Sequence, residues 1–354
     1  NEETKIKKNK LKNIEVGHIN RGIKINSVKY SAKDLNLQNR RPNILVKRNT
    51  KVNDAILKSH RDHEFKPKVN FPVIMNEFLP DIKTHVGSPE RFLYSGIGVK
   101  ASTEIQFSRN IVFYSVIGKS IVSNFDRKTS IPNSSLENVR TRVLDYLQEG
   151  SKDIYVTSME LESIWSPYQN IYAKLGMGYL ESMYGGVAAE IMYKPFYSNI
   201  AISYEFNNVR SRNFDQKFSF SSYKVDTNHL NLAYYHPKSN ILAKWSYGNY
   251  LAGDKGYTLD LSRRMPSGWQ AGFWFSNTNV SEEEFGEGSF DKGFYIHVPL
   301  NIFTKNYSKD IQSFSLRTMT RDGGQKLELR NRLIDSFYGS TLNEFTENWS
   351  NYLD

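Results

Sequence analysis

The feature that most limits the fold of this chain is a strict two-residue alternation of apolar and polar side chains. In the clearest segment one face carries Ile171, Ala173, Leu175, Met177 and Tyr179, and the other carries Tyr172, Lys174, Gly176 and Gly178. The same period recurs at 199–207, 257–262, 269–276 and 294–300. Successive side chains of a β-strand point to opposite sides, so this period predicts strands with two chemically different faces. A helix would repeat every 3.6 residues.

Twelve segments from about Phe92 onward are predicted to be strands. They are 92–106, 109–122, 153–165, 169–180, 185–194, 198–209, 226–236, 240–250, 256–264, 268–279, 290–300 and 311–319. The preceding ninety residues contain short apolar stretches interrupted by prolines, among them Pro72 and Pro80. We therefore expect little regular structure before Arg91.

Two architectures share this alternation. A soluble β-sandwich points its apolar faces inward, and a membrane β-barrel points them towards lipid. Aromatic residues near strand ends favour the barrel, because they resemble an interfacial girdle: Tyr179, Tyr193, Tyr257 and Trp269. Segments of about ten residues also match the length that a tilted strand needs to cross a bilayer.

The connections alternate in length along the chain. Short turn-like connections lie at 166–170, 195–199, 236–240 and 266–268, and mostly longer ones at 126–152, 181–184, 210–225, 251–255 and 280–289. In an up-and-down meander the two sets lie at opposite ends of the sheet, as in a barrel. Twelve strands would leave both chain ends on the long-loop side, whereas outer-membrane barrels usually place them beside the short turns. Either a further strand exists or the loops are inverted.

Composition narrows the function classes. The chain has a net charge of +10, and residues 1–60, with 15 basic and 5 acidic groups, carry all of it. The other 294 residues have 32 basic and 32 acidic groups and are neutral. The excess predicts a basic arm and argues against a nucleic-acid-binding body. The absence of cysteine excludes disulfides, thiolate metal sites and cysteine nucleophiles.

Four unusual strings lie in the long connections. They read Tyr-Leu-Glu-Ser-Met-Tyr-Gly-Gly at 179–186, Arg-Asn-Phe-Asp-Gln at 212–216, Tyr-Leu-Ala-Gly-Asp-Lys-Gly at 250–256 and Phe-Gly-Glu-Gly-Ser-Phe-Asp-Lys-Gly at 285–293. In the order and spacing of these strings, from about Pro89 to Gly324, the chain resembles the YjbH-type family of exopolysaccharide and capsule biosynthesis proteins. The resemblance implies an outer-membrane β-barrel, often a lipoprotein, of which this chain resembles the C-terminal half.

We therefore predict an all-β protein of the bacterial outer membrane. An antiparallel up-and-down transmembrane β-barrel of about twelve strands occupies 91–324, after a basic, mostly irregular region at 1–90. An extension at 325–354 carries a short amphipathic helix behind Ser340. The resemblance implies non-enzymatic participation in exopolysaccharide or capsule secretion, as a conduit or as an anchor of the export machinery. The rival interpretation is a soluble periplasmic β-sandwich that binds glycans.

The implied partners are extracellular polysaccharide, outer-membrane lipid, other polysaccharide-export proteins and a missing N-terminal half, with no nucleic acid. Charged loop residues are candidates for a salt-bridged loop layer or for a polysaccharide or partner site: Arg212, Asp215, Asp254, Lys255, Glu287, Asp291 and Lys292. A second set is predicted to line the lumen: Lys174, Glu205, Lys244, Asp260, Arg263 and Trp274. Lys174, Arg263 and Lys244 would attract an acidic glycan, and replacing Lys174 by Leu should be tolerated.

Catalysis, cofactors and metals are not expected. Carboxylates such as Glu160 and Glu162 are abundant, but acids in a solvated run lack the environment that raises the pKa of one of them. The seven histidines show no zinc-like spacing, and His60 with His63 is their one near pair. Residues 322–324, Asp-Gly-Gly, are predicted to form a turn, because no Lys-Ser/Thr follows to hold phosphate.

Overall fold

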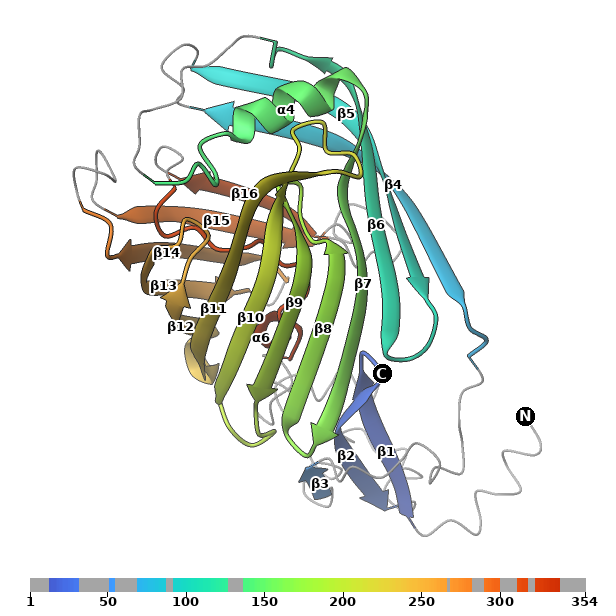
Figure 1. Ribbon diagram of the computed structural model, residues 1–354. Helices are drawn as coiled ribbons and strands as arrows, with labels where there is room; N and C mark the ends of the chain where they lie inside the picture. The colour runs from blue at the N-terminus through green and yellow to red at the C-terminus, as the bar shows by residue number, and fades with distance from the viewer. Residues whose placement is uncertain are drawn as a thin grey trace.

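Thirteen antiparallel strands form one strongly curved sheet in the computed structural model (Figure 1). The structure describes residues 13–31, 51–54, 69–86, 92–126, 136–265, 268–281, 290–299, 311–317 and 322–337. Each strand pairs with its neighbours in the sequence, so the sheet is a meander from β4 to β16. The sheet is not closed, because among the described residues its edge strands β4 and β16 do not pair with each other.

The strands of this sheet are β4 (Val73–Val86), β5 (Leu93–Gln106), β6 (Ile111–Ser123), β7 (Ile154–Tyr168), β8 (Ile171–Tyr179), β9 (Tyr184–Tyr193), β10 (Ile200–Arg212), β11 (Phe220–His236), β12 (Ile241–Asn249), β13 (Lys255–Arg264), β14 (Gln270–Thr278), β15 (Asp291–Pro299) and β16 (Ile311–Arg317). A separate small sheet comprises β1 (Asn13–Asn20), β2 (Ile23–Ser31) and β3 (Lys51–Asp54). The helical elements are α4 (Val143–Lys152), the 3₁₀ turn η2 (Pro237–Ser239) and α6 (Leu333–Phe337).

All twelve predicted segments are strands, and the prediction of an all-β chain is confirmed. The expectation of little regular structure before Arg91 is wrong, because β1 to β4 lie there. In β4 the exposed residues Ile74, Phe78 and Ile82 alternate with less exposed ones. Pro80 is tolerated within it because β4 is an edge strand. The predicted helix behind Ser340 lies outside the described residues.

The connections do lie alternately at two ends of the sheet, which we call the short-turn end and the long-loop end. Asn170 and Asn240 adopt left-handed φ values of 64° and 54° in two of the short turns, as their composition predicts. The strand β4 changes the position of one end of the sheet, whereas the last strand, β16, still ends at the long-loop end, where Arg317 lies opposite Gly293. Val73 lies opposite Gln106, which precedes the short β5–β6 turn, so the sheet begins at the short-turn end.

The two faces of the sheet differ sharply. Along β10, Ile200, Ile202, Tyr204 and Phe206 are 43–48% exposed, whereas Ala201, Ser203, Glu205 and Asn207 are 0–4% exposed. We call these the outer and the inner face. The apolar side chains therefore point away from the interior of the curved sheet, and the polar ones point into it.

The inner face is covered by residues 322–337, which we call the inner segment. Near the short-turn end its helix α6 contacts β8, β9 and β10 within the curve of the sheet (Figure 1). There Leu333, Ile334 and Phe337 join an apolar cluster with Tyr172 of β8. A second apolar cluster includes Val139, Leu251 and Leu327 at the long-loop end. No described helix is long and apolar enough to cross a membrane.

Candidate functional site

A row of ionisable side chains crosses the inner face between the two apolar clusters. In the strand register Lys174 lies opposite Glu190, Glu190 opposite Glu205, and Glu205 opposite His229. We call these four residues the first polar row. All are buried. Because a buried charge is costly unless it is paired, each charged member of this row requires a partner.

The inner segment supplies these partners. Lys174 Nζ donates to Asn331 O at 2.9 Å, the Leu333 N–H donates to Glu190 Oε2 at 2.8 Å, and Arg332 Nε donates to Glu205 Oε2 at 3.0 Å. Three successive residues of the segment thus bind three successive strands. The row therefore fixes the position of the segment across the sheet.

Lys174 has a second partner in Glu162 of β7. Its Nζ lies 3.0 Å from Glu162 Oε2, and both side chains are 2% exposed. Glu162 also accepts hydrogen bonds from Asn331 Nδ2 at 3.1 and 3.2 Å. Arg21, in the turn between β1 and β2, lies 3.6 Å from the same carboxylate and donates to Asn331 Oδ1. The small sheet is therefore joined to the inner segment through this cluster.

Replacing Lys174 by Leu should destabilise the protein, contrary to the expectation from the sequence. The change removes the ammonium group paired with the buried Glu162 carboxylate and the donor to Asn331 O, at a cost of about 1–3 kcal/mol. The measurement is the temperature at which the folded form is lost on a gel of samples heated stepwise. The exposed Lys224 of β11 provides a matched control, since Lys224→Leu removes no buried contact. Equal temperatures for the two variants would contradict the assignment.

A second polar row lies further along the sheet. Lys244 is opposite Asp260, and Asp260 is opposite Trp274. Lys244 Nζ lies 3.5 Å from Asp260 Oδ2 and 3.4 Å from Asp335 Oδ1 of the inner segment. The Tyr295 hydroxyl donates to Asp260 Oδ1 at 2.9 Å. Three predicted lumen residues are thus brought together on the inner face.

Lys174 and Glu205 also lie on the inner face, in the first polar row. The prediction that Arg263 lines the lumen is wrong. Arg263 is exposed and shares the outer face with Leu259 and Leu261, because inner positions of β13 are occupied by Thr258, Asp260 and Ser262. The two-residue period itself places Arg263 outside.

Arg212 is fully buried at the long-loop end. Its guanidinium donates to four main-chain carbonyl oxygens: Thr157 and Lys217 at 3.2 Å, and Glu181 and Gln216 at 2.8 Å. It also lies 4.5 Å from the ring centre of Tyr179. An arginine suits this position because its five donors have a fixed planar geometry. Asp215 accepts a hydrogen bond from the Lys217 N–H at 3.1 Å and shapes the adjoining loop.

A buried ion pair joins two other loops at this end. Arg140 Nη1 and Nη2 donate to the two carboxylate oxygens of Glu181 at 2.6 and 3.0 Å. Burial by itself lowers the pKa of Arg140, but Glu181 and Glu328 raise it above its ordinary value. Both partners also bind the inner segment: Arg140 donates to Lys326 O, and Glu181 accepts from the Glu328 N–H. The sequence analysis did not identify this pair.

The predicted turn at 322–324 is the start of the inner segment. Asp322 Oδ1 accepts hydrogen bonds from the N–H groups of Val139, Arg140 and Thr141 at 2.8–3.0 Å. Gly324 has a φ of 73° and donates its N–H to Asp254 Oδ2 at 2.7 Å. Burial raises the pKa of Asp254. Asp254, one of the loop candidates, therefore holds the inner segment.

The remaining loop candidates have separate surroundings. Lys255 lies 5.4 Å from the ring centre of Tyr247, and Lys292 lies 4.5 Å from that of Phe290. Asp291 accepts a hydrogen bond from Trp274 Nε1 at 3.3 Å. Glu287 lies outside the described residues. The candidates thus contact main-chain groups and rings at several places rather than converging on one exposed site.

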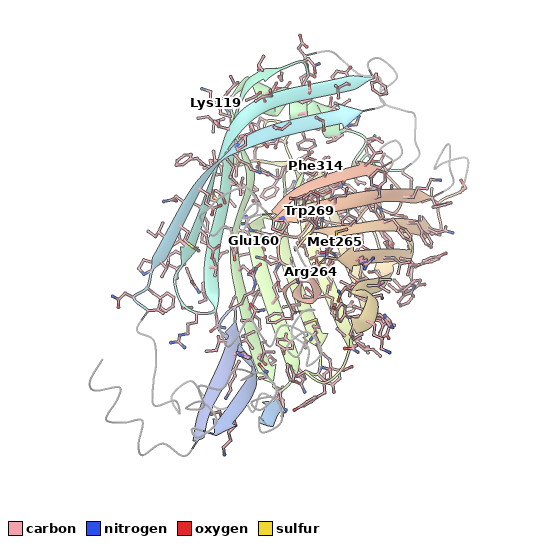
Figure 2. All side chains as sticks on the ribbon, turned by 180° about the vertical axis from the view of Figure 1, so that it is seen from behind. Lys119, Glu160, Arg264, Met265, Trp269 and Phe314 are labelled. Atoms are coloured by element: carbon pink, nitrogen blue, oxygen red, sulfur yellow. The ribbon has the colours of Figure 1, made fainter. Side chains whose placement is uncertain are left out.

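The described carboxylates show no metal-binding arrangement. Within the described ranges no three His, Asp or Glu side chains are grouped to hold a metal ion; His60 and His63 lie outside these ranges. Glu160, labelled in Figure 2, and Glu162 lie on the inner face of β7 and are 1% and 2% exposed. Their burial leaves a dissolved glycan no direct access to either carboxylate.

Comparison with known protein families matches residues 4–337 to YjbH, described as "Exopolysaccharide biosynthesis protein YbjH". Among curated proteins, the "Uncharacterized lipoprotein YjbH" of Escherichia coli (strain K12) is 35% identical over 272 residues. The match covers 75% of this chain and 38% of that protein. The chain thus spans well under half the length of this relative.

Two solved structures show weak similarity. "OmpTdeltaL8 (loop L8 deletion mutant of OmpT), an outer membrane protein of Vibrio cholerae" is 10% identical, with a TM-score of 0.28, over 63% of this chain and 87% of its own. "Salmonella typhi OmpF complex with Daunomycin" is 8% identical, with a TM-score of 0.33, over 73% of this chain and 90% of its own. Similarities at this level carry no argument about the present chain.

Proposed function

The chain belongs to the YjbH exopolysaccharide biosynthesis family, and from this we propose that it takes part in exopolysaccharide production as a protein of the outer membrane. In this proposal the curved sheet is the wall of a β-barrel, and the chain anchors other components of polysaccharide export. The role requires no catalysis. Its partners are outer-membrane lipid, the polysaccharide, export proteins and the further domain that the longer relative suggests.

The observation that carries the membrane proposal is the exposed apolar outer face. Large apolar side chains are exposed on consecutive strands, including Leu175, Ile191, Ile202, Leu232 and Phe273. A water-soluble protein rarely exposes a continuous apolar surface of this extent. The rival β-sandwich would bury these side chains, so the orientation of the two faces favours the barrel.

The height of the apolar face fits a bilayer. On β8 it runs from Ile171 to Tyr179, about 27 Å along the strand. At the about 35–45° tilt of barrel strands this corresponds to a height of about 19–22 Å, comparable to the apolar band of about 25 Å in outer-membrane barrels. Charged outer-face residues lie beyond it: Arg210, Lys224 and Asp226 towards the long-loop end, and Arg263 towards the short-turn end. This order of apolar belt and charged margins is typical of a lipid-facing wall.

The filled interior favours an anchor over an open conduit. The inner segment lies against the inner face, and apolar clusters occur towards both of its ends. Polymer passage would require this segment to leave the first polar row. Its contacts there include the ion pair between Arg332 and Glu205.

Cell fractionation tests the proposal. The full chain, expressed in a Gram-negative host, should sediment with outer membranes, resist extraction by carbonate, and migrate differently on a gel before and after boiling. Deletion of the gene in the native host should lower surface polysaccharide. Release with the periplasmic contents would overturn the membrane proposal, and unchanged surface polysaccharide would overturn the role in its production.

A further inference from the structure

A cavity of about 200 Å³ lies between the inner segment and the inner face of β9–β15. Pockets for drug-sized ligands have about 300–1,000 Å³, so this cavity has room for one small ring rather than for a polymer strand. The second polar row forms one side of it, because Lys244, Asp260 and Trp274 all line the cavity.

The ion-paired side chains of the two polar rows differ in their exposure. The side chains of Lys244 and Asp260 are 21% and 19% exposed, whereas Lys174 and Glu162 are 2% exposed. The Lys244 ion pairs, at 3.4 and 3.5 Å, are also longer than the 3.0 Å of Lys174 with Glu162. The Lys244–Asp260 pair therefore has free volume beside its polar atoms, whereas the Lys174–Glu162 pair has none.

Glu190 adds a buried carboxylate. Its Oε2 accepts the Leu333 N–H, the Ser203 hydroxyl also interacts with the carboxylate, and Oε1 makes no hydrogen bond of good geometry with a described residue. Glu190 lines the cavity. A hydroxyl group in the cavity could donate a further hydrogen bond to this carboxylate. The cavity is therefore polar at this end.

We infer that this cavity binds a single neutral sugar unit, placed against Trp274 and hydrogen-bonded by Asp260 and Lys244. Sugar hydroxyls both donate and accept hydrogen bonds, which matches the carboxylate of Asp260 and the ammonium group of Lys244 on adjacent strands. The indole ring offers an apolar surface for the C–H face of the sugar ring. The inference rests on the proposed function, which makes a polysaccharide the source of the sugar.

The charge of the lining selects against an acidic sugar. The cavity is lined by five carboxylates and three cations: Glu190, Asp260, Asp291, Glu328 and Asp335, with Lys244, Lys326 and Arg332. Of the three cations that the sequence analysis assigned to an acidic glycan, Lys174 is sealed and Arg263 lies outside. An added carboxylate would increase the excess of negative charge, so a neutral hexose is the better fit.

Saturation-transfer NMR on the full chain in detergent micelles tests this inference, with D-glucose, D-galactose and D-mannose as neutral probes and D-glucuronate as the acidic one. At least one neutral hexose should receive saturation, and glucuronate should receive less. Asp260→Asn, which preserves the side-chain shape, and Trp274→Leu should each weaken binding at least about tenfold. The matched controls on the outer face, Asp226→Asn and Trp245→Leu, should bind as the parent does.

Three results would overturn the inference: no transfer to any neutral hexose, stronger binding of glucuronate, or equal binding by Asp260→Asn and Asp226→Asn. The heat-dependent gel shift of each variant checks its folding separately. A chain that sediments with outer membranes but binds no hexose would refute the sugar site alone. A chain that binds the hexose but is released with the periplasm would refute the membrane proposal alone.

Discussion

Replacing Phe273 by Arg should prevent the chain from assembling in the outer membrane. Phe273 is 52% exposed in the middle of β14, and on the outer face it lies opposite Leu261 and Phe294. A cation at the bilayer midplane of a barrel wall costs about 2–4 kcal/mol. That is a large part of the about 5–15 kcal/mol by which most proteins are stable. The fraction of protein in the outer-membrane pellet, and its gel shift on boiling, measure the effect.

Asn277→Arg is the matched control for this change. Asn277 lies on the same face of the same strand, four residues nearer the long-loop end, and is already exposed and polar. It should assemble normally, since an arginine there reaches water. Leu175→Arg on β8 should fail as Phe273→Arg does. If Phe273→Arg and Asn277→Arg reach the membrane in equal amounts, the outer face does not contact lipid.

The sequence could predict strands and faces because both follow from a local period. The inner positions of Lys174, Lys244, Asp260 and Trp274 required only the odd-even alternation of each strand. The same rule applied to Arg263 places it outside. The partners of these residues required the register between strands, which depends on connections whose length and conformation have no simple code.

Two larger features were missed for different physical reasons. The strand β4 shows the alternation of Ile74, Phe78 and Ile82, but Pro80 suggested a break, and only its edge position makes the proline acceptable. The inner segment has no period at all. Its course is determined by contacts with Glu181 and Asp254, which lie far away in the sequence. Such contacts leave no local signal.

Arg140→Met should produce the largest loss of stability among changes at the long-loop end. Glu181 would remain buried, with its charge no longer paired with the guanidinium, and the Lys326 carbonyl would lose a donor. Removing one partner of a buried ion pair typically costs about 3–5 kcal/mol. Stepwise heating followed by electrophoresis should show the folded form lost at a lower temperature than in the parent chain. The double variant Arg140→Met with Glu181→Leu should recover part of this loss, because no buried charge is left unpaired. The Lys326 carbonyl and the Glu328 N–H still lose their partners in it.

The same variants distinguish the proposed role as an anchor from the alternative role as a conduit. Arg140 and Glu181 hold residues 326 and 328, so losing their pair loosens the inner segment where it enters the sheet. If this segment closes the interior, Arg140→Met should raise ion conductance in planar bilayers, and the double variant, which lacks the contacts with both residue 326 and residue 328, should conduct at least as much. A parent chain that already conducts strongly would mean that the described segment leaves a continuous path, and the conduit would then be the better proposal. Low conductance in all three would mean that the contacts of the polar rows hold the segment in place without the Arg140 pair.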